Sequence, residues 1–169
     1  MMRSWAVFDS PIQSGLHTMK YKGNLPFGEA LAFQMVGFVK SLQWNVDLLI
    51  PVPLGKKRLQ ERGYNQVALV AEPLAYWTGI HYLPQALWKA RETRSQVGLS
   101  ASQRQKNVLN AYQADARIVA RKSILLMDDV STTGSTISAC TQALLSAGAR
   151  EVYGITIARA LAHHDLGRV

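Results

Sequence analysis

One stretch, residues 124–136, constrains the fold more than any other part of the chain. It reads Ile-Leu-Leu-Met-Asp-Asp-Val-Ser-Thr-Thr-Gly-Ser-Thr. The opening apolar run is typical of a strand buried in a parallel sheet, and the helical pattern from Thr136 to Ala147 predicts a helix directly afterwards. The polar loop would then lie between the end of the strand and the unpaired N–H groups of that helix. The stretch therefore predicts a site for a phosphate beside a polyhydroxyl group.

Two adjacent carboxylates, Asp128 and Asp129, end the apolar run. They are acceptors for sugar hydroxyls, and a divalent cation can sit nearby. The alternative is an ordinary βα turn in which these residues only cap a helix. A cap needs one such residue, so the run of polar residues and glycine exceeds that role. The chain has neither G-x-x-x-x-G-K-[ST] nor G-x-G-x-x-G, which argues against a P-loop NTPase and a dinucleotide-binding unit.

The same stretch resembles the phosphoribosyl pyrophosphate (PRPP) signature of type I phosphoribosyltransferases. The resemblance implies that Asp128 and Asp129 hold the 2′- and 3′-hydroxyls of the ribose and reach Mg²⁺, mainly through water. It also implies that the loop wraps the 5′-phosphate through Ser131, Thr132, Thr133, Gly134, Ser135 and Thr136.

Strand and helix patterns alternate along the rest of the chain. This alternation predicts an α/β fold, a parallel twisted sheet with helices on both faces, in a single domain over residues 1–169 with its core at about 18–160. The first 25 residues are expected to be irregular. The expected helices cover residues 27–42, 64–77, 100–109 and 134–146, and the expected strands cover 46–50, 87–90, 124–127 and 152–157.

A second anion site is expected in the loop from Pro51 to Arg58, which follows an early strand. The diphosphate of PRPP needs such a site, and similar enzymes place it after an early strand. The contributing groups are the backbone N–H groups of Leu54 and Gly55 and the side chains of Lys56, Lys57 and Arg58. A solvated basic turn is the alternative for this segment.

Three further segments narrow the resemblance to the ComF family of phosphoribosyltransferase-like competence proteins. They are Lys20-Tyr21-Lys22-Gly23, then Pro51–Leu54 with Arg58-Leu59 and Glu61-Arg62-Gly63-Tyr64-Asn65-Gln66, and finally Arg91, Thr93, Gln96, Leu99, Arg104 and Asn107. Tyr64 stands where the family pattern has phenylalanine. Family members commonly begin with a four-cysteine zinc module, which is absent here because Cys140 is the only cysteine. Roles that depend on zinc are therefore not carried over.

The net charge of +8 favours anionic partners, including phosphorylated metabolites and nucleic acid. The segment Arg91–Asn107 is the candidate for a mobile lid, in which Arg91, Arg94 and Arg104 would add positive charge at the leaving group. No apolar run approaches the ~20 residues that span a bilayer, and no signal-peptide core is visible, so a cytoplasmic protein with no membrane partner is expected.

Three functions are consistent with these residues. The first is a Mg²⁺-dependent phosphoribosyltransferase with an unknown acceptor, since Thr132 stands where purine-type relatives have a carboxylate that handles the base proton. The second is a non-catalytic PRPP- or nucleotide-binding protein. The third is a single-stranded-DNA-associated competence protein for DNA uptake. The partners considered are PRPP or a related phosphorylated ribose, single-stranded DNA, competence-machinery proteins and further copies of the chain.

Overall fold

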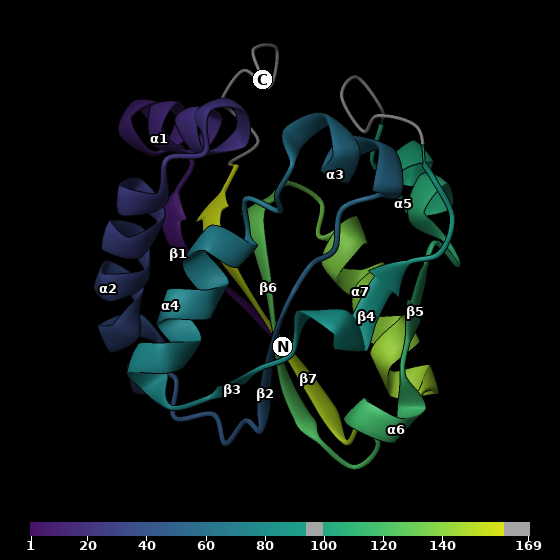
Figure 1. Ribbon diagram of the computed structural model, residues 1–169. Helices are drawn as coiled ribbons and strands as arrows, with labels where there is room; N and C mark the ends of the chain where they lie inside the picture. Colours follow the sequence, from purple (N-terminus) through teal and green to yellow (C-terminus); the bar gives the residue numbers. More distant parts are fainter. Residues whose placement is uncertain (94–99, 161–169) are drawn as a thin grey trace.

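The computed structural model describes residues 1–93 and 100–160, and its centre is a five-stranded sheet (Figure 1). All neighbouring strands are parallel, which confirms the expected fold class. The strand order is β1-β7-β6-β2-β3. The strands are β1 (Met2–Val7), β7 (Glu151–Arg159), β6 (Ser123–Ser131), β2 (Leu48–Pro51) and β3 (His81–Tyr82).

Both faces of the sheet are covered. One face packs against three helices, α1 (Ser10–Lys22), α2 (Leu25–Ser41) and α4 (Ala68–Thr78). The other face packs against α6 (Ala116–Val119) and α7 (Ser135–Ser146). An antiparallel ribbon of β4 (Leu87–Lys89) and β5 (Tyr112–Ala114) also covers this second face. Leu125 and Met127 of β6 belong to the first core, whereas Ile124 and Leu126 belong to the second. Burial on both faces explains the continuous apolar run, since neither set of alternating side chains meets water.

Two local expectations were wrong. The first 25 residues are ordered as β1 and α1, with Leu16 and Met19 buried. The second helix of the prediction starts at Ala68 rather than residue 64, because the preceding side chains make specific contacts described below. The predicted strand at 87–90 is confirmed as β4, and it pairs with β5 in the antiparallel ribbon.

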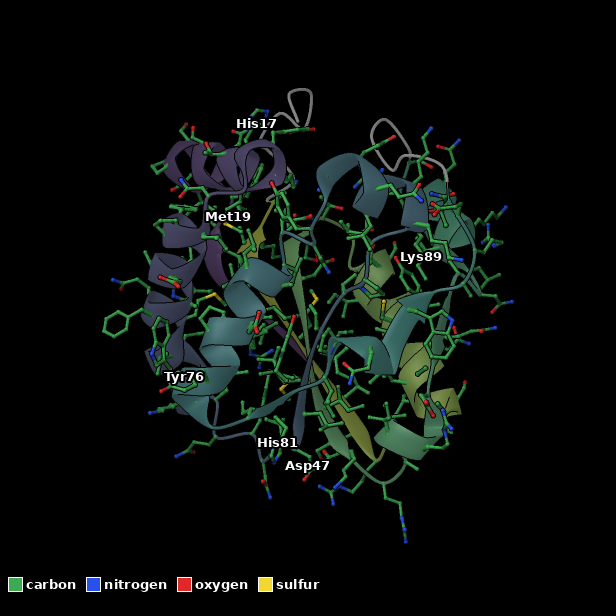
Figure 2. All side chains as sticks on the ribbon, in the orientation of Figure 1. His17, Met19, Asp47, Tyr76, His81 and Lys89 are labelled. Carbon is green, nitrogen blue, oxygen red and sulfur yellow. The ribbon has the colours of Figure 1, made fainter. Side chains whose placement is uncertain are left out.

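The carboxyl ends of β6 and β7 meet near α1, α3 (Lys56–Arg62) and α5 (Ala101–Val108) at one end of the molecule (Figure 1). Figure 2 shows His17 and Lys89 towards this end and Asp47 and His81 at the opposite end. Ligands of open α/β sheets bind beyond the carboxyl ends of the strands, so this end is where a site is expected. Within the described ranges, no helix has the length and apolar character needed to cross a bilayer.

Candidate functional site

The loop between β6 and α7 joins a strand end to a helix start, the position where the sequence predicted a phosphate site. β6 ends at Ser131 and α7 begins at Ser135, and Gly134 caps the helix with a φ of 74°. That left-handed conformation favours glycine, which has no Cβ. The hydroxyls of Thr133 and Ser135 share a hydrogen bond of 2.7 Å. The Ser131 hydroxyl is buried and has no hydrogen-bond partner among the residues that the structure describes, a costly state that a bound ligand or water would relieve.

Asp129 faces α1 and the segment before α4. Its side chain is almost fully buried, yet Lys20 Nζ lies 3.4 Å from its Oδ2 and Gln66 Nε2 donates to the same oxygen at 3.2 Å. Its Oδ1 accepts the Val130 N–H at 2.7 Å. Burial pushes the pKa of Asp129 up, but Lys20, Gln66 and the Val130 N–H together hold it below the usual value. Asp129 is therefore a fixed, ionised group.

Asp128 faces the opposite layer, as expected for adjacent strand residues. Its Oδ1 accepts the Asp129 N–H at 2.9 Å. Burial and the neighbouring charge of Asp129 raise its pKa well above the usual value. Burial raises the pKa values of Tyr112 and Cys140, and the negative charge of Asp128 raises them further. Because Tyr112 and Cys140 belong to the core beneath α7 and the β4–β5 ribbon, Asp128 lies beside that core. The two carboxylates therefore differ. Asp129 pairs with Lys20, whereas Asp128 makes no ion pair with a residue that the structure describes.

The residues that hold Asp129 were not named as site residues from the sequence. Lys20 lies in α1, and Gln66 is itself held by Arg62, whose Nη1 donates to Gln66 Oε1 at 2.7 Å. Both Lys20 and Gln66 lie in the segments that resemble the ComF family. That resemblance was the available signal, but sequence alone does not show which carboxylate they contact.

The same segments also hold α1 against the sheet. The Tyr64 hydroxyl donates to the Met19 carbonyl at 2.6 Å and accepts the Gly23 N–H at 2.8 Å. Asn65 Nδ2 donates to the Val52 carbonyl at 3.0 Å. Residues 64–66 thus connect α1, the end of β2 and Asp129, which explains why the helical pattern of this stretch does not become helix.

The second predicted loop already holds an anion from the same chain. The Lys57 N–H donates to Glu92 Oε1 at 3.3 Å, and a Cβ added at Gly55 would overlap the Glu92 carboxylate. Lys56, Lys57 and Arg58 are exposed, and Leu54 is half-buried. Glycine at position 55 therefore allows an acidic group to approach the backbone closely. A diphosphate at this loop would have to displace Glu92.

The predicted lid arginines lie in different places. Arg91 Nη2 donates to the carbonyls of Asn107 and Leu109, at 3.1 and 2.8 Å, so it closes the carboxyl end of α5. Arg104 reaches the β6–α7 loop, where its Nη1 donates to Thr132 Oγ1 at 2.6 Å. Arg94, Gln96 and Leu99 lie outside the described residues.

Lys89 is a further cation near the second loop. Its Nζ donates to Thr93 Oγ1 at 2.6 Å, and the ammonium lies 5.8 Å from the centre of the Tyr112 ring. Burial lowers the pKa of Lys89, and the charge of Arg58 lowers it further. A partly desolvated lysine beside a basic loop is a suitable counter-charge for a polyanion.

A cavity of about 320 Å³ opens beside α1 and shares Lys20 with the acid pair. It is lined by Phe8, Gln13, Ser14, Leu16, His17, Thr18 and Lys20. Among the residues that the structure describes, no group of three or more His, Cys, Asp or Glu side chains could hold a metal ion.

Two solved structures share the fold of this chain. Glutamine PRPP amidotransferase from B. subtilis matches with a TM-score of 0.56 at 20% identity, over 84% of this chain and 30% of that chain. An adenine phosphoribosyltransferase matches with a TM-score of 0.51 at 14% identity, over 87% of this chain and 75% of that chain. The fold is that of the type I phosphoribosyltransferases.

Curated relatives then identify the family. The DNA utilization protein YhgH of Salmonella typhimurium is 31% identical over 159 residues, which cover 91% of this chain and 70% of that protein. Competence protein F of Haemophilus influenzae is 35% identical over 116 residues, or 68% of this chain and 51% of that protein. The chain belongs to the ComF family, as the sequence motifs predicted. No protein-family model matches the sequence.

Proposed function

We propose that the chain binds PRPP, or a related phosphorylated ribose, at the carboxyl end of β6. One observation carries this proposal. Asp128 and Asp129 lie at the end of β6, just before a helix start, and the Ser131 hydroxyl between them and that helix is buried without a partner among the described residues. The loop from Ser131 to Thr136 would hold the 5′-phosphate through N–H groups, hydroxyls and the helix dipole.

The acid pair would orient the ribose. Asp128 accepts from ribose hydroxyls, because its carboxylate makes no ion pair within the described part of the chain and gains most from a donor. Asp129 keeps its contacts with Lys20 and Gln66 and fixes the strand end that presents Asp128. This division of labour follows from the different surroundings of the two carboxylates.

The diphosphate would lie on the loop from Leu54 to Arg58 after displacing Glu92. Arg58 and Lys89 lie near enough to influence each other's charge, and both would stabilise the negative charge of the diphosphate. Asp128 fits Mg²⁺, because this cation usually takes one or two protein carboxylates together with phosphate oxygens and waters. Bound Mg²⁺ would neutralise charge on the diphosphate.

Phosphoribosyl transfer to an unidentified acceptor is the reaction that this arrangement supports. The bond between C1 of the ribose and the diphosphate breaks, the diphosphate leaves with the bonding electrons, and a bond forms from C1 to the acceptor. The protein would position the ribose and stabilise the leaving group. The cavity beside α1 is a candidate place for the acceptor, because its lining residue Lys20 also contacts Asp129. A non-catalytic member would use the same contacts for binding alone.

A thermal unfolding experiment tests the proposal. PRPP with Mg²⁺ at about 100 times its Kd should stabilise the protein by about 2.7 kcal/mol, because the ligand binds only the folded state. For a chain of this size, this corresponds to a rise in Tm of roughly 5–11 °C. Mg²⁺ without PRPP is the control. An unchanged melting curve at millimolar PRPP and Mg²⁺ would remove the proposal.

A surface cluster favours single-stranded DNA as a second candidate ligand, and the names of the YhgH and competence relatives support it. Tyr21 is 62% exposed, its ring centre lies 4.7 Å from that of His17, and the Arg62 guanidinium lies 5.6 Å from the Tyr21 ring centre. Exposed aromatic rings beside cations stack on bases and attract phosphates.

Tyr21→Ala should weaken binding of a single-stranded oligonucleotide about 5- to 100-fold, because stacking on one base contributes about 1–3 kcal/mol. Fluorescence anisotropy over a salt series measures this, and the affinity of the parent should fall steeply with salt. Tyr76→Ala is the matched control, since Tyr76 is 84% exposed on α4. If the parent does not bind at low salt, or if both variants bind equally well, this second function is wrong.

A further inference from the structure

Arg104 crosses from α5 to the loop between β6 and α7. Its Nη1 donates to Thr132 Oγ1 at 2.6 Å, and α5 packs against α7. The guanidinium is therefore held against the loop that precedes α7. The sequence-based expectation for this residue was a charge at the leaving diphosphate, which is proposed to bind at a different loop, Leu54–Arg58.

Two polar side-chain atoms in the described part of the chain are buried without a hydrogen-bond partner. They are Arg104 Nε and Ser131 Oγ. One belongs to the residue that contacts the loop, and the other belongs to the loop itself. The Arg104 Nε–H can only donate, so its missing partner is an acceptor such as a phosphate oxygen. A buried donor of this kind is costly unless a partner arrives.

The loop needs a positive charge from elsewhere. Residues 131–136 contain no lysine or arginine, and neither does the rest of α7. Helix N–H groups and the dipole provide only partial charges. Arg104 makes no ion pair with a carboxylate among the residues that the structure describes, so its charge is available to an anion.

We infer that Arg104 is the residue that makes this loop specific for a phosphomonoester dianion. It holds the loop through Thr132 and donates from Nε to the phosphate. The inference rests on the proposed function and assigns Arg104 to the 5′-phosphate rather than to the leaving diphosphate. Arginine suits this double contact because its guanidinium presents several donors in a fixed plane.

Isothermal titration calorimetry with two probes tests the inference. Ribose 5-phosphate reports on the β6–α7 loop, and inorganic diphosphate reports on the Leu54–Arg58 loop. Arg104→Gln should lower the affinity for ribose 5-phosphate about 10- to 100-fold, the range expected for a charge-assisted hydrogen bond. Its affinity for diphosphate should change less than about twofold. Arg104→Lys should recover part of the loss. Arg117→Gln, at an exposed arginine of α6, should bind both probes like the parent.

Phosphorus NMR adds a readout that a purely structural role would not change. The second pKa of a free phosphomonoester is about 6, and a nearby guanidinium favours the dianion. Phosphate bound to the parent should therefore titrate at lower pH than phosphate bound to Arg104→Gln. Thermal unfolding of each variant establishes that it is folded.

The outcomes separate the two proposals. If the parent binds neither ribose 5-phosphate nor PRPP, the proposed function fails and the inference fails with it. If the parent binds but folded Arg104→Gln binds ribose 5-phosphate equally well, only the inference is overturned. If Arg104→Gln no longer binds diphosphate but still binds ribose 5-phosphate, Arg104 contacts the leaving group, and the inference is also overturned.

Discussion

Asp128→Asn is expected to raise the thermal stability of the free protein and to abolish most of its response to PRPP. The free protein holds the Asp128 carboxylate in a half-buried position beside the charge of Asp129, which penalises its ionised form. Asparagine removes that penalty and keeps an oxygen for the Asp129 N–H. Its neutral amide is a poorer acceptor for ribose hydroxyls, so ligand affinity should fall about 10- to 100-fold.

The size of the lost response follows from mass action. At a PRPP concentration that stabilises the parent by about 2.7 kcal/mol, a 100-fold weaker variant would be stabilised by only about 0.4 kcal/mol. Differential scanning fluorimetry with and without PRPP and Mg²⁺ measures both changes. Asp47→Asn, at the opposite end of the sheet, is the control and should keep the ligand response.

The gain in stability should depend on pH. The folded-state pKa of Asp128 is raised, so its favourable contribution is fully present below the unfolded value of about 3.9 and is lost as pH rises through the folded value. The stability advantage of Asp128→Asn should therefore grow between acidic and neutral pH. A folded Asp128→Asn protein that keeps the full PRPP response would show that Asp128 does not hold the ligand.

Lys20→Met is expected to destabilise the protein by about 3 kcal/mol at neutral pH, because it leaves the buried Asp129 carboxylate without its cation. The methionine side chain keeps most of the apolar length of lysine, so lost packing contributes little. The corresponding fall in Tm is roughly 6–12 °C. Chemical denaturation measures the change, with Lys122→Met at an exposed position as the matched control.

This effect should depend on pH, whereas a simple loss of packing would not. Asp129 has a lowered pKa in the parent, so its contribution is present above the unfolded value and is lost as pH falls through the folded value. Without Lys20, burial should raise the pKa of Asp129, and the variant then loses stability as pH rises. The gap between parent and variant should be widest near neutral pH and narrow below about pH 4. A gap that does not change with pH would contradict the assigned ion pair.

The sheet centre was predictable because its sequence signal is local. The strand β6 and the helix after it could be predicted from residues 124–146 alone. Because both faces of β6 are buried, its apolar residues form an unbroken run that is easy to recognise in the sequence. The prediction ended the strand at residue 127, whereas β6 continues to Ser131. Asp128 and Val130 are aligned with Thr156 and Ala158 of β7, and such pairing is not visible in a single strand's sequence.

The amino-terminal region was not predictable in the same way. Met2–Val7 has a mixed pattern, and it is a strand because it pairs with β7, about 150 residues away along the chain. The contacts of Asp129 with Lys20 and Gln66 are long-range for the same reason. Residue types indicated a phosphate and ribose site, but the distinct surroundings of Asp128 and Asp129 come from packing, as does the approach of Arg104 to Thr132.

A crystal structure of the protein soaked with ribose 5-phosphate tests the central claim most directly. The phosphate should lie against the N–H groups at the start of α7 and accept a hydrogen bond from the Ser131 hydroxyl, and the ribose hydroxyls should donate to Asp128. Ligand bound at another surface, with the Ser131 hydroxyl still unpartnered and Asp128 free of the sugar, would contradict it.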